Sequence, residues 1–175
     1  MLTQYYKMQG KNVILAKELS TPIGGQIKQL SKEGKLTPEL KTYLSAADRR
    51  LLLDRLGQVS KDDIVIFDRY VPSAIAYRMA DGIDKDWVKS VNKNFPKHDL
   101  GFYIDITPET SVKRNTDQKF NILYSYEHLD KVRKAYMSIL DEYSLQKIDG
   151  DAGLNNIFKQ IATRINYRLN EKERG

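Results

Sequence analysis

The sequence predicts an α/β domain in which a parallel sheet is flanked by helices. Short apolar runs bounded by turn residues alternate with longer segments of helical periodicity. Residues 64–67, Ile-Val-Ile-Phe, are consecutively apolar, which is typical of a strand buried on both faces in a parallel sheet. No linker-like stretch or repeat interrupts residues 1–175, so we expect one domain with right-handed crossovers.

The individual elements follow from local signals. The predicted strands are apolar runs at residues 12–16, 64–67, 102–106 and 147–149. The predicted helices are amphipathic or begin at Thr-Pro pairs. Four of the segments have predicted ranges: residues 22–34, residues 72–95 in two helices separated at Asp81-Gly82, residues 126–145 and residues 154–170. Two further helices are predicted to begin at Thr37-Pro38 and at Thr107-Pro108-Glu109. In the helix that opens at Thr37, the apolar residues at helical spacing are Leu40, Tyr43, Leu44, Ala47 and Leu51.

Composition excludes several classes of protein. The chain has 175 residues, no cysteine, and two histidines far apart, His98 and His128. Disulfides, thiolate metal sites and a histidine-based zinc centre are therefore excluded, and we expect any metal to be a hard cation with oxygen ligands. The sequence contains neither an apolar run long enough to span a membrane nor an apolar signal core, so we expect a cytoplasmic protein.

The net charge of +6 has two interpretations. Basic residues are interleaved with acidic ones, as in residues 47–55 and 168–175, which favours ion-paired, solvated helix faces. The alternative is a phosphate-rich partner. A nucleotide would satisfy that alternative as well as DNA or RNA would.

Polar residues follow the predicted strands directly. Lys17-Glu18, Asp68-Arg69-Tyr70 and Thr107-Pro108 all stand at strand ends, and in parallel sheets ligands bind beyond those carboxyl ends. An arginine there can grip a phosphate with two hydrogen bonds, and a neighbouring aspartate can orient it or hold water on Mg²⁺. From these residues alone the alternative stays open that Asp68 caps a loop and Arg69 pairs with a surface carboxylate.

Several motifs, in order and at suitable spacing, resemble those of the thymidylate kinase family. They are VILAKELSTPIG, YLSAADRRLLLDR, VIFDRYVPSAIAY, FYIDITPETSVKR and YEHLDKVRKAY, which together extend over nearly the whole chain. The resemblance implies a P-loop α/β fold and transfer of the terminal phosphate of ATP to dTMP, with Mg²⁺, to give dTDP. It also implies a homodimer.

The resemblance assigns expected roles to particular residues. Arg69 is expected to bind the phosphate of the acceptor nucleotide, and Asp68 to lie near the magnesium ion and the reacting phosphates. Arg49 matches the arginine that contacts the thymine edge; the alternative is a surface arginine paired with Asp48, Asp54 or solvent.

The remaining acceptor-side residues and the lid are assigned in the same way. Lys17 stands where the family usually has arginine, beside the acidic Glu18, while Ser73 and Tyr77 match residues that line the nucleoside pocket. Packing of Tyr77 in the core is the alternative. The family's lid corresponds to about residues 113–125, where the basic candidates for ATP and the transferring phosphate are Lys113, Arg114 and Lys119.

Two departures from the family pattern bear on function. Ser45 occupies the position where the family offers an aromatic ring to thymine, so either Tyr43 or another ring substitutes or base selectivity differs from dTMP. Base stacking contributes roughly 1–3 kcal/mol, so its loss would weaken binding by about tenfold or more.

The second departure is that no G-x-x-x-x-G-K-[ST] motif occurs in residues 1–175. Gly34-Lys35 does not form one, because Leu36 follows the lysine. We expect the family's first, central strand and P-loop to lie upstream of Met1, through a start codon assigned too late; a truncated remnant or a short protein with another partner are the alternatives.

Three functions are compatible with these sequence features. The first is a thymidylate kinase, and the second is a catalytically inactive nucleotide-binding or scaffold protein. The third, and weakest, is a basic nucleic-acid-binding module, which would bind oligonucleotides in a salt-dependent way.

Overall fold

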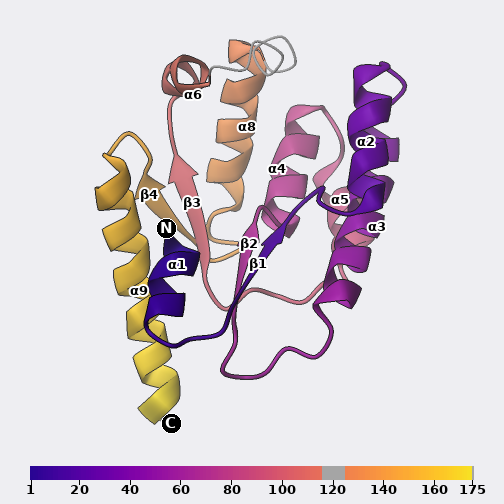
Figure 1. Cartoon of the computed structure of the whole chain (residues 1–175). Helices are drawn as coiled ribbons and strands as arrows, with labels where there is room; N and C mark the ends of the chain where they lie inside the picture. The colour runs from indigo at the N-terminus through magenta and orange to yellow at the C-terminus, as the bar shows by residue number, and fades with distance from the viewer. Residues whose placement is uncertain (116–124, 175) are drawn as a thin grey trace. The chain divides into compact units, whose positions relative to one another are not determined.

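The computed structural model describes residues 1–115 and 125–174, with side chains to residue 171 (Figure 1). The chain divides into two compact units, and each is described by itself. The first unit comprises Met1 and residues 3–96, and the second comprises Leu2 and residues 97–175.

The first unit contains a two-stranded parallel sheet and five helices. Strand β1 (Val13–Lys17) pairs in parallel with β2 (Ile64–Asp68), in a register that runs from Val13 opposite Ile64 to Lys17 opposite Asp68. The helices are α1 (Leu2–Met8), α2 (Pro22–Lys32), α3 (Pro38–Leu56), α4 (Val71–Ala80) and α5 (Lys85–Asn92). Figure 1 shows β1 beside β2 and α2 along α3.

Thr-Pro pairs start the helices where the sequence predicts. The Thr21 hydroxyl accepts a hydrogen bond from the Ile23 amide, and the Thr37 hydroxyl accepts one from the Leu40 amide. Each cap satisfies an amide that the first helical turn leaves unpaired, and proline lacks the donor that would otherwise be orphaned at the next position. Gly34, at φ +67°, lies just beyond the end of α2, so Gly34-Lys35 belongs to a helix terminus.

The buried face of α3 differs from the prediction. Three of the apolar residues expected to face the core, Leu40, Tyr43 and Ala47, are exposed, whereas the buried residues are Thr42, Asp48 and Arg49. The spacing of apolar residues therefore predicted the helix correctly, but the prediction of which side of the helix is buried was wrong. A helix that turns polar side chains inward needs partners for them, and those partners define the site described below.

Strand β2 is only partly buried, which corrects the expectation of burial on both faces. Ile64, Val65, Ile66 and Phe67 all have intermediate exposure. Among the described residues, the strands pair as two separate two-stranded sheets, β1 with β2 and β3 with β4, so β2 has a neighbour on one side only. The prediction of parallel pairing is confirmed.

The second unit repeats the parallel pairing. Strand β3 (Gly101–Asp105) runs parallel to β4 (Leu145–Asp149), and the helices are α6 (Pro108–Arg114), α8 (Tyr126–Ile139) and α9 (Leu154–Arg174). The helix predicted over residues 126–145 ends at Ile139, because the chain turns through Ser144 at φ +49° and enters β4 at Leu145. In the described part of the chain, no helix is sufficiently long and apolar to cross a membrane.

A buried aspartate ties the second unit together at the end of β3. Asp105 accepts two hydrogen bonds from Arg133, at 2.6 and 2.9 Å, and pairs with Lys147 at 2.9 Å. The Tyr103 hydroxyl donates a further bond to the same carboxylate at 3.2 Å. The Arg133 guanidinium first, and then the Lys147 ammonium, hold the pKa of Asp105 well below its ordinary value.

This low pKa predicts that the second unit loses stability in acid. A carboxyl whose pKa is lowered by folding contributes stability above its unfolded pKa, about 4, and that stability is lost as the pH falls below this value. We expect Asp105→Asn to reduce the free energy of unfolding at pH 7 by roughly 1–3 kcal/mol and to flatten its decline below pH 4. Urea unfolding between pH 2.5 and 7 measures both. An unchanged acid slope in the variant would contradict this assignment.

Candidate functional site

The carboxyl ends of β1 and β2 bring polar residues together in the first unit, as the sequence predicts. Lys17 and Asp68 are register partners, and the Lys17 ammonium lies 3.4 Å from the Asp68 carboxylate. The Glu18 amide donates to the Asp68 carbonyl at 3.2 Å. Both side chains of the Lys17–Asp68 pair are more than half exposed, so the pair stabilises little and remains available to a ligand.

The backbone is strained just beyond both strands. Leu19 has φ +59° and Arg69 has φ +71°, a left-handed conformation that costs a residue with a side chain about 1 kcal/mol or more. Gly24 accommodates the first of these turns, since a Cβ there would lie 2.4 Å from the Leu19 backbone. Such strain gathers at binding sites and persists only where surrounding contacts impose it.

Asp48 on α3 imposes the turn after β1. Its carboxylate is fully buried and accepts the Thr21 hydroxyl at 2.6 Å and the Leu19 amide at 2.8 Å. Asp48 therefore fixes the loop that carries Glu18. The alternative in which Asp48 neutralises Arg49 on the helix surface is wrong.

Arg49 lies at the centre of the cluster, and its side chain is 1% exposed. Its Nη2 donates to a Glu18 carboxylate oxygen at 2.6 Å, and its Nη1 donates to the Asn92 side-chain oxygen at 2.5 Å. The guanidinium carbon lies 5.6 Å from the centre of the Tyr70 ring and 5.2 Å from that of Phe95. Arg49 Nε is buried and has no hydrogen-bond partner among the described residues, and such a donor costs stability unless ordered water or a ligand satisfies it.

Arg69 lies on the exposed side of the same carboxylate. Its Nε donates to the Ser73 hydroxyl at 2.8 Å and lies 3.7 Å from Glu18, while its guanidinium covers the Tyr77 ring at 4.3 Å. Ser73 and Tyr77 therefore orient Arg69 directly. Glu18 thus bridges two arginines, one buried and one 45% exposed.

The Tyr43 ring, one candidate for base stacking, lies against Trp87. Tyr43 is 55% exposed and packs edge-on against Trp87, with ring centres 5.3 Å apart. The rings near Arg49 are instead Tyr70 and Phe95. Phe95 follows α5 and lies outside every quoted motif, so motif matching could not reveal it.

Lys41 is a further member of the cluster that sequence reasoning missed. It lies on α3, is half-buried, and has no ion-pair partner among the described residues. Burial, followed by the charges of Arg78 and Arg69, lowers its pKa from 10.5 to about 8, and the carboxylates of Asp81 and Glu18 oppose the shift only in part. An unpaired cation beside two arginines favours an anionic ligand.

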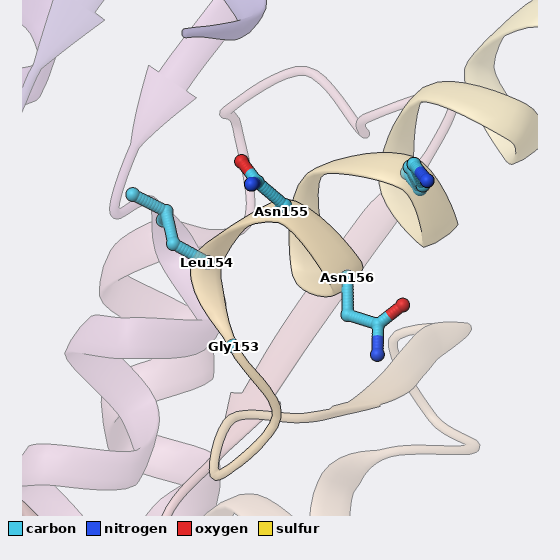
Figure 2. A pocket seen from close by; sticks show the side chains of 5 residues that line it. Gly153, Leu154, Asn155 and Asn156 are labelled. Atoms are coloured by element: carbon cyan, nitrogen blue, oxygen red, sulfur yellow. The ribbon is translucent and has the colours of Figure 1, made fainter.

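The predicted lid residues belong to the second unit. Arg114 donates to the Gly150 carbonyl at 2.7 Å, Lys113 is exposed, and Lys119 lies outside the described residues. The second unit also has a shallow hollow of about 430 Å³ at the start of α9, lined by Gly153, Leu154, Asn155, Asn156 and Lys159. Figure 2 shows Leu154 and Asn156 pointing in opposite directions from this turn.

Asp68 is the carboxylate of the first unit that could bind a magnesium ion. Among the described residues, no three acidic or histidine side chains are grouped to hold a metal ion by themselves. Asp68 is exposed at the strand end beside Arg69. A single carboxylate with water and substrate phosphates is the usual environment of Mg²⁺ in proteins.

A parallel α/β unit with guanidinium groups gathered beyond its strand ends is typical of proteins that bind phosphate-bearing ligands. A family model described as thymidylate kinase matches residues 1–161, and the chain belongs to the thymidylate kinase family. Members of this family are phosphotransferases.

Several relatives support the assignment. The chain is 36% identical to the probable thymidylate kinase 1 of Saccharolobus solfataricus over 90% of its own length and 82% of that protein. It is 37% identical to the probable thymidylate kinase of Sulfurisphaera tokodaii, over 91% of this chain and 83% of the relative. The thymidylate kinase of Caldanaerobacter subterraneus subsp. tengcongensis is 30% identical over 97% of this chain and 88% of its own length.

Proposed function

We propose that this protein transfers the terminal phosphate of ATP to dTMP, giving dTDP, and that the first unit holds dTMP. The observation that carries the proposal is the Glu18 carboxylate bridging Arg49 and Arg69 beyond the ends of β1 and β2. In this arrangement the exposed Arg69 binds the phosphate. Arg49, whose buried Nε lacks a partner, donates to the thymine edge.

Each arginine suits its proposed role. Ser73 and Tyr77 orient the Arg69 guanidinium, and the planar fork of an arginine suits two oxygens of a phosphate. Thymine presents carbonyl acceptors at its edge, and Arg49 supplies only donors. Because Glu18 pairs with both guanidinium groups at the strand ends, the arginines are oriented before the nucleotide arrives.

We also propose which residues bind the phosphate donor, ATP, and its magnesium ion. Asp68 is the residue that would hold Mg²⁺ through water, and the ion would neutralise charge on the phosphates when bound. Lys113, Arg114 and Lys119 remain the predicted lid cations for ATP. A second candidate function, a catalytically inactive dTMP-binding protein, is favoured by Lys17 and Ser45, which depart from the family pattern.

Two measurements on this chain separate these functions. Formation of dTDP from ATP, Mg²⁺ and dTMP is followed by chromatography, and dTMP binding by calorimetry. We expect both for a kinase. Binding without dTDP formation would identify the inactive binding protein, and the absence of dTMP binding at millimolar concentration would overturn both proposals.

Lys41 provides a prediction in which stability and binding change in opposite directions. At pH 7 the Lys41 ammonium is protonated despite its burial, which lowers the free energy of unfolding. This free energy rises again between pH 8 and pH 10.5, where Lys41 has lost its proton in the folded protein and keeps it in the unfolded chain. We expect Lys41→Met to raise the free energy of unfolding at pH 7 by roughly 1–3 kcal/mol and to remove the increase above pH 8. We expect dTMP binding to weaken on the order of tenfold, since one cation near the phosphate is lost.

Urea unfolding and calorimetry at pH 7 and pH 9.5 test this prediction. In the unchanged protein, dTMP affinity should fall as the pH rises through about 8, because Lys41 loses its charge. Lys28→Met is the matched control, since Lys28 is an exposed lysine on α2. A Lys41→Met protein that is less stable at pH 7 would contradict the assignment.

A further inference from the structure

The strongest unexplained feature of the first unit is Asn92, a buried amide at the end of α5. Its side chain is 4% exposed and connects two elements. The Asn92 Nδ2 donates to the Val88 carbonyl at 2.8 Å, and its Oδ1 accepts from Arg49 Nη1 at 2.5 Å. The motifs shared with the thymidylate kinase family do not include this residue.

Chemistry fixes the orientation of this amide. A backbone carbonyl can only accept, so the group facing Val88 must be the Nδ2 donor. A guanidinium can only donate, so the group facing Arg49 must be the Oδ1 acceptor. Both requirements are met by one rotation of the amide, and reversing it would set donor against donor at Arg49 and acceptor against acceptor at Val88.

Asn92 and Glu18 together determine the plane of the Arg49 guanidinium. Glu18, just after β1, accepts a hydrogen bond from Arg49 Nη2, and Asn92, on α5, accepts one from Arg49 Nη1. Each terminal nitrogen of Arg49 therefore has one fixed hydrogen bond. The donors that remain are Nε, which has no partner among the described residues, and the second hydrogen of each terminal nitrogen. Without Asn92, the guanidinium could rotate about its bond to Glu18.

We propose that Asn92 is a positioning residue for recognition of the nucleobase, acting through Arg49. This inference rests on the proposed binding of dTMP in the first unit. Asn92 sets which donors of Arg49 face the base edge. Thymine presents a carbonyl acceptor where cytosine presents an amino donor, so a fixed guanidinium favours dTMP over dCMP. Helix α5 thereby contributes to base selectivity without touching the nucleotide.

The test compares dTMP and dCMP binding to the full chain by calorimetry. We expect Asn92→Leu, which is similar in size and has no acceptor, to weaken dTMP binding 10- to 100-fold and to reduce the preference for dTMP over dCMP. Asn92→Asp keeps an oxygen toward Arg49 and should retain dTMP affinity within a few-fold, although it should lower stability because its second oxygen faces the Val88 carbonyl. Asn94→Leu is the matched control, because Asn94 is an exposed asparagine two residues along.

The outcomes distinguish this inference from the proposed function. If the unchanged protein does not bind dTMP, both fail. If it binds dTMP and Asn92→Leu retains the same affinity and the same dTMP:dCMP ratio, only the role of Asn92 is overturned. If Asn92→Leu does not fold, Asn92→Ser replaces it, because its hydroxyl is too short to reach Arg49. The same loss of affinity and selectivity is expected, and unchanged values would overturn the inference.

Discussion

Replacing Arg69 with methionine is expected to reduce dTMP affinity on the order of 100-fold. Truncating one partner of a hydrogen-bonded charge pair typically costs 2–5 kcal/mol, and Arg69 is the arginine whose guanidinium is both oriented and accessible. Folding should be affected little, since the side chain is 45% exposed. Calorimetric titration with dTMP and with thymidine measures the effect, and the loss should be confined to the phosphorylated ligand.

Two further variants define what Arg69 contributes. Arg69→Lys keeps the charge without the planar fork, so it should restore only part of the affinity. Arg50→Met removes an exposed arginine of α3 that pairs with Asp54, and it should leave dTMP binding unchanged. An Arg69→Met protein that binds dTMP as tightly as the Arg50→Met control would show that the phosphate does not contact Arg69.

Replacing Glu18 with glutamine is expected to destabilise the protein by about 3 kcal/mol. Arg49 is buried, and Glu18 is the carboxylate that neutralises it at 2.6 Å. Removing one partner of a buried ion pair leaves an uncompensated charge, which typically costs 3–5 kcal/mol, and the glutamine amide oxygen recovers only part of the lost interaction. Urea unfolding at pH 7 measures this change.

A double variant separates the buried charge from the loss of packing. In Glu18→Gln with Arg49→Met, no buried arginine remains to be neutralised, because Arg69 is 45% exposed, so much of the lost stability should return even though dTMP binding does not. Glu33→Gln serves as the control, because Glu33 pairs with Lys35 at the protein surface, and no measurable change is expected. Equal destabilisation in the single and double variants would contradict the role of Glu18 as the counterion.

The elements of the fold were largely predictable from local chemistry. Thr-Pro pairs, apolar runs and the Asp81-Gly82 break all mark real boundaries, because each acts through its immediate neighbours. The burial of β2 was not predictable in this way. The burial of residues 64–67 depends on which strands pair with β2, and an apolar run in the sequence does not indicate which strands those are.

The site was predictable at the strand ends and less so elsewhere. Asp68 is the last residue of β2, and Glu18 and Arg69 directly follow β1 and β2, so topology alone brings them together. Asn92 and Lys41 were missed because their surroundings come from segments distant in the sequence, and a lone asparagine or lysine on a helix usually faces solvent. The role of Asp48 was not predictable either, because its hydrogen bond from the Leu19 amide forms only in the folded loop.

The central claim is that dTMP binds beyond the ends of β1 and β2, and a crystal structure of this chain with dTMP tests it most directly. We expect the phosphate to contact Arg69 and the thymine edge to accept a hydrogen bond from Arg49, with Glu18 still bridging the two arginines. A structure in which dTMP occupies another surface, while the Arg49–Glu18–Arg69 cluster remains as it is without ligand, would contradict the account.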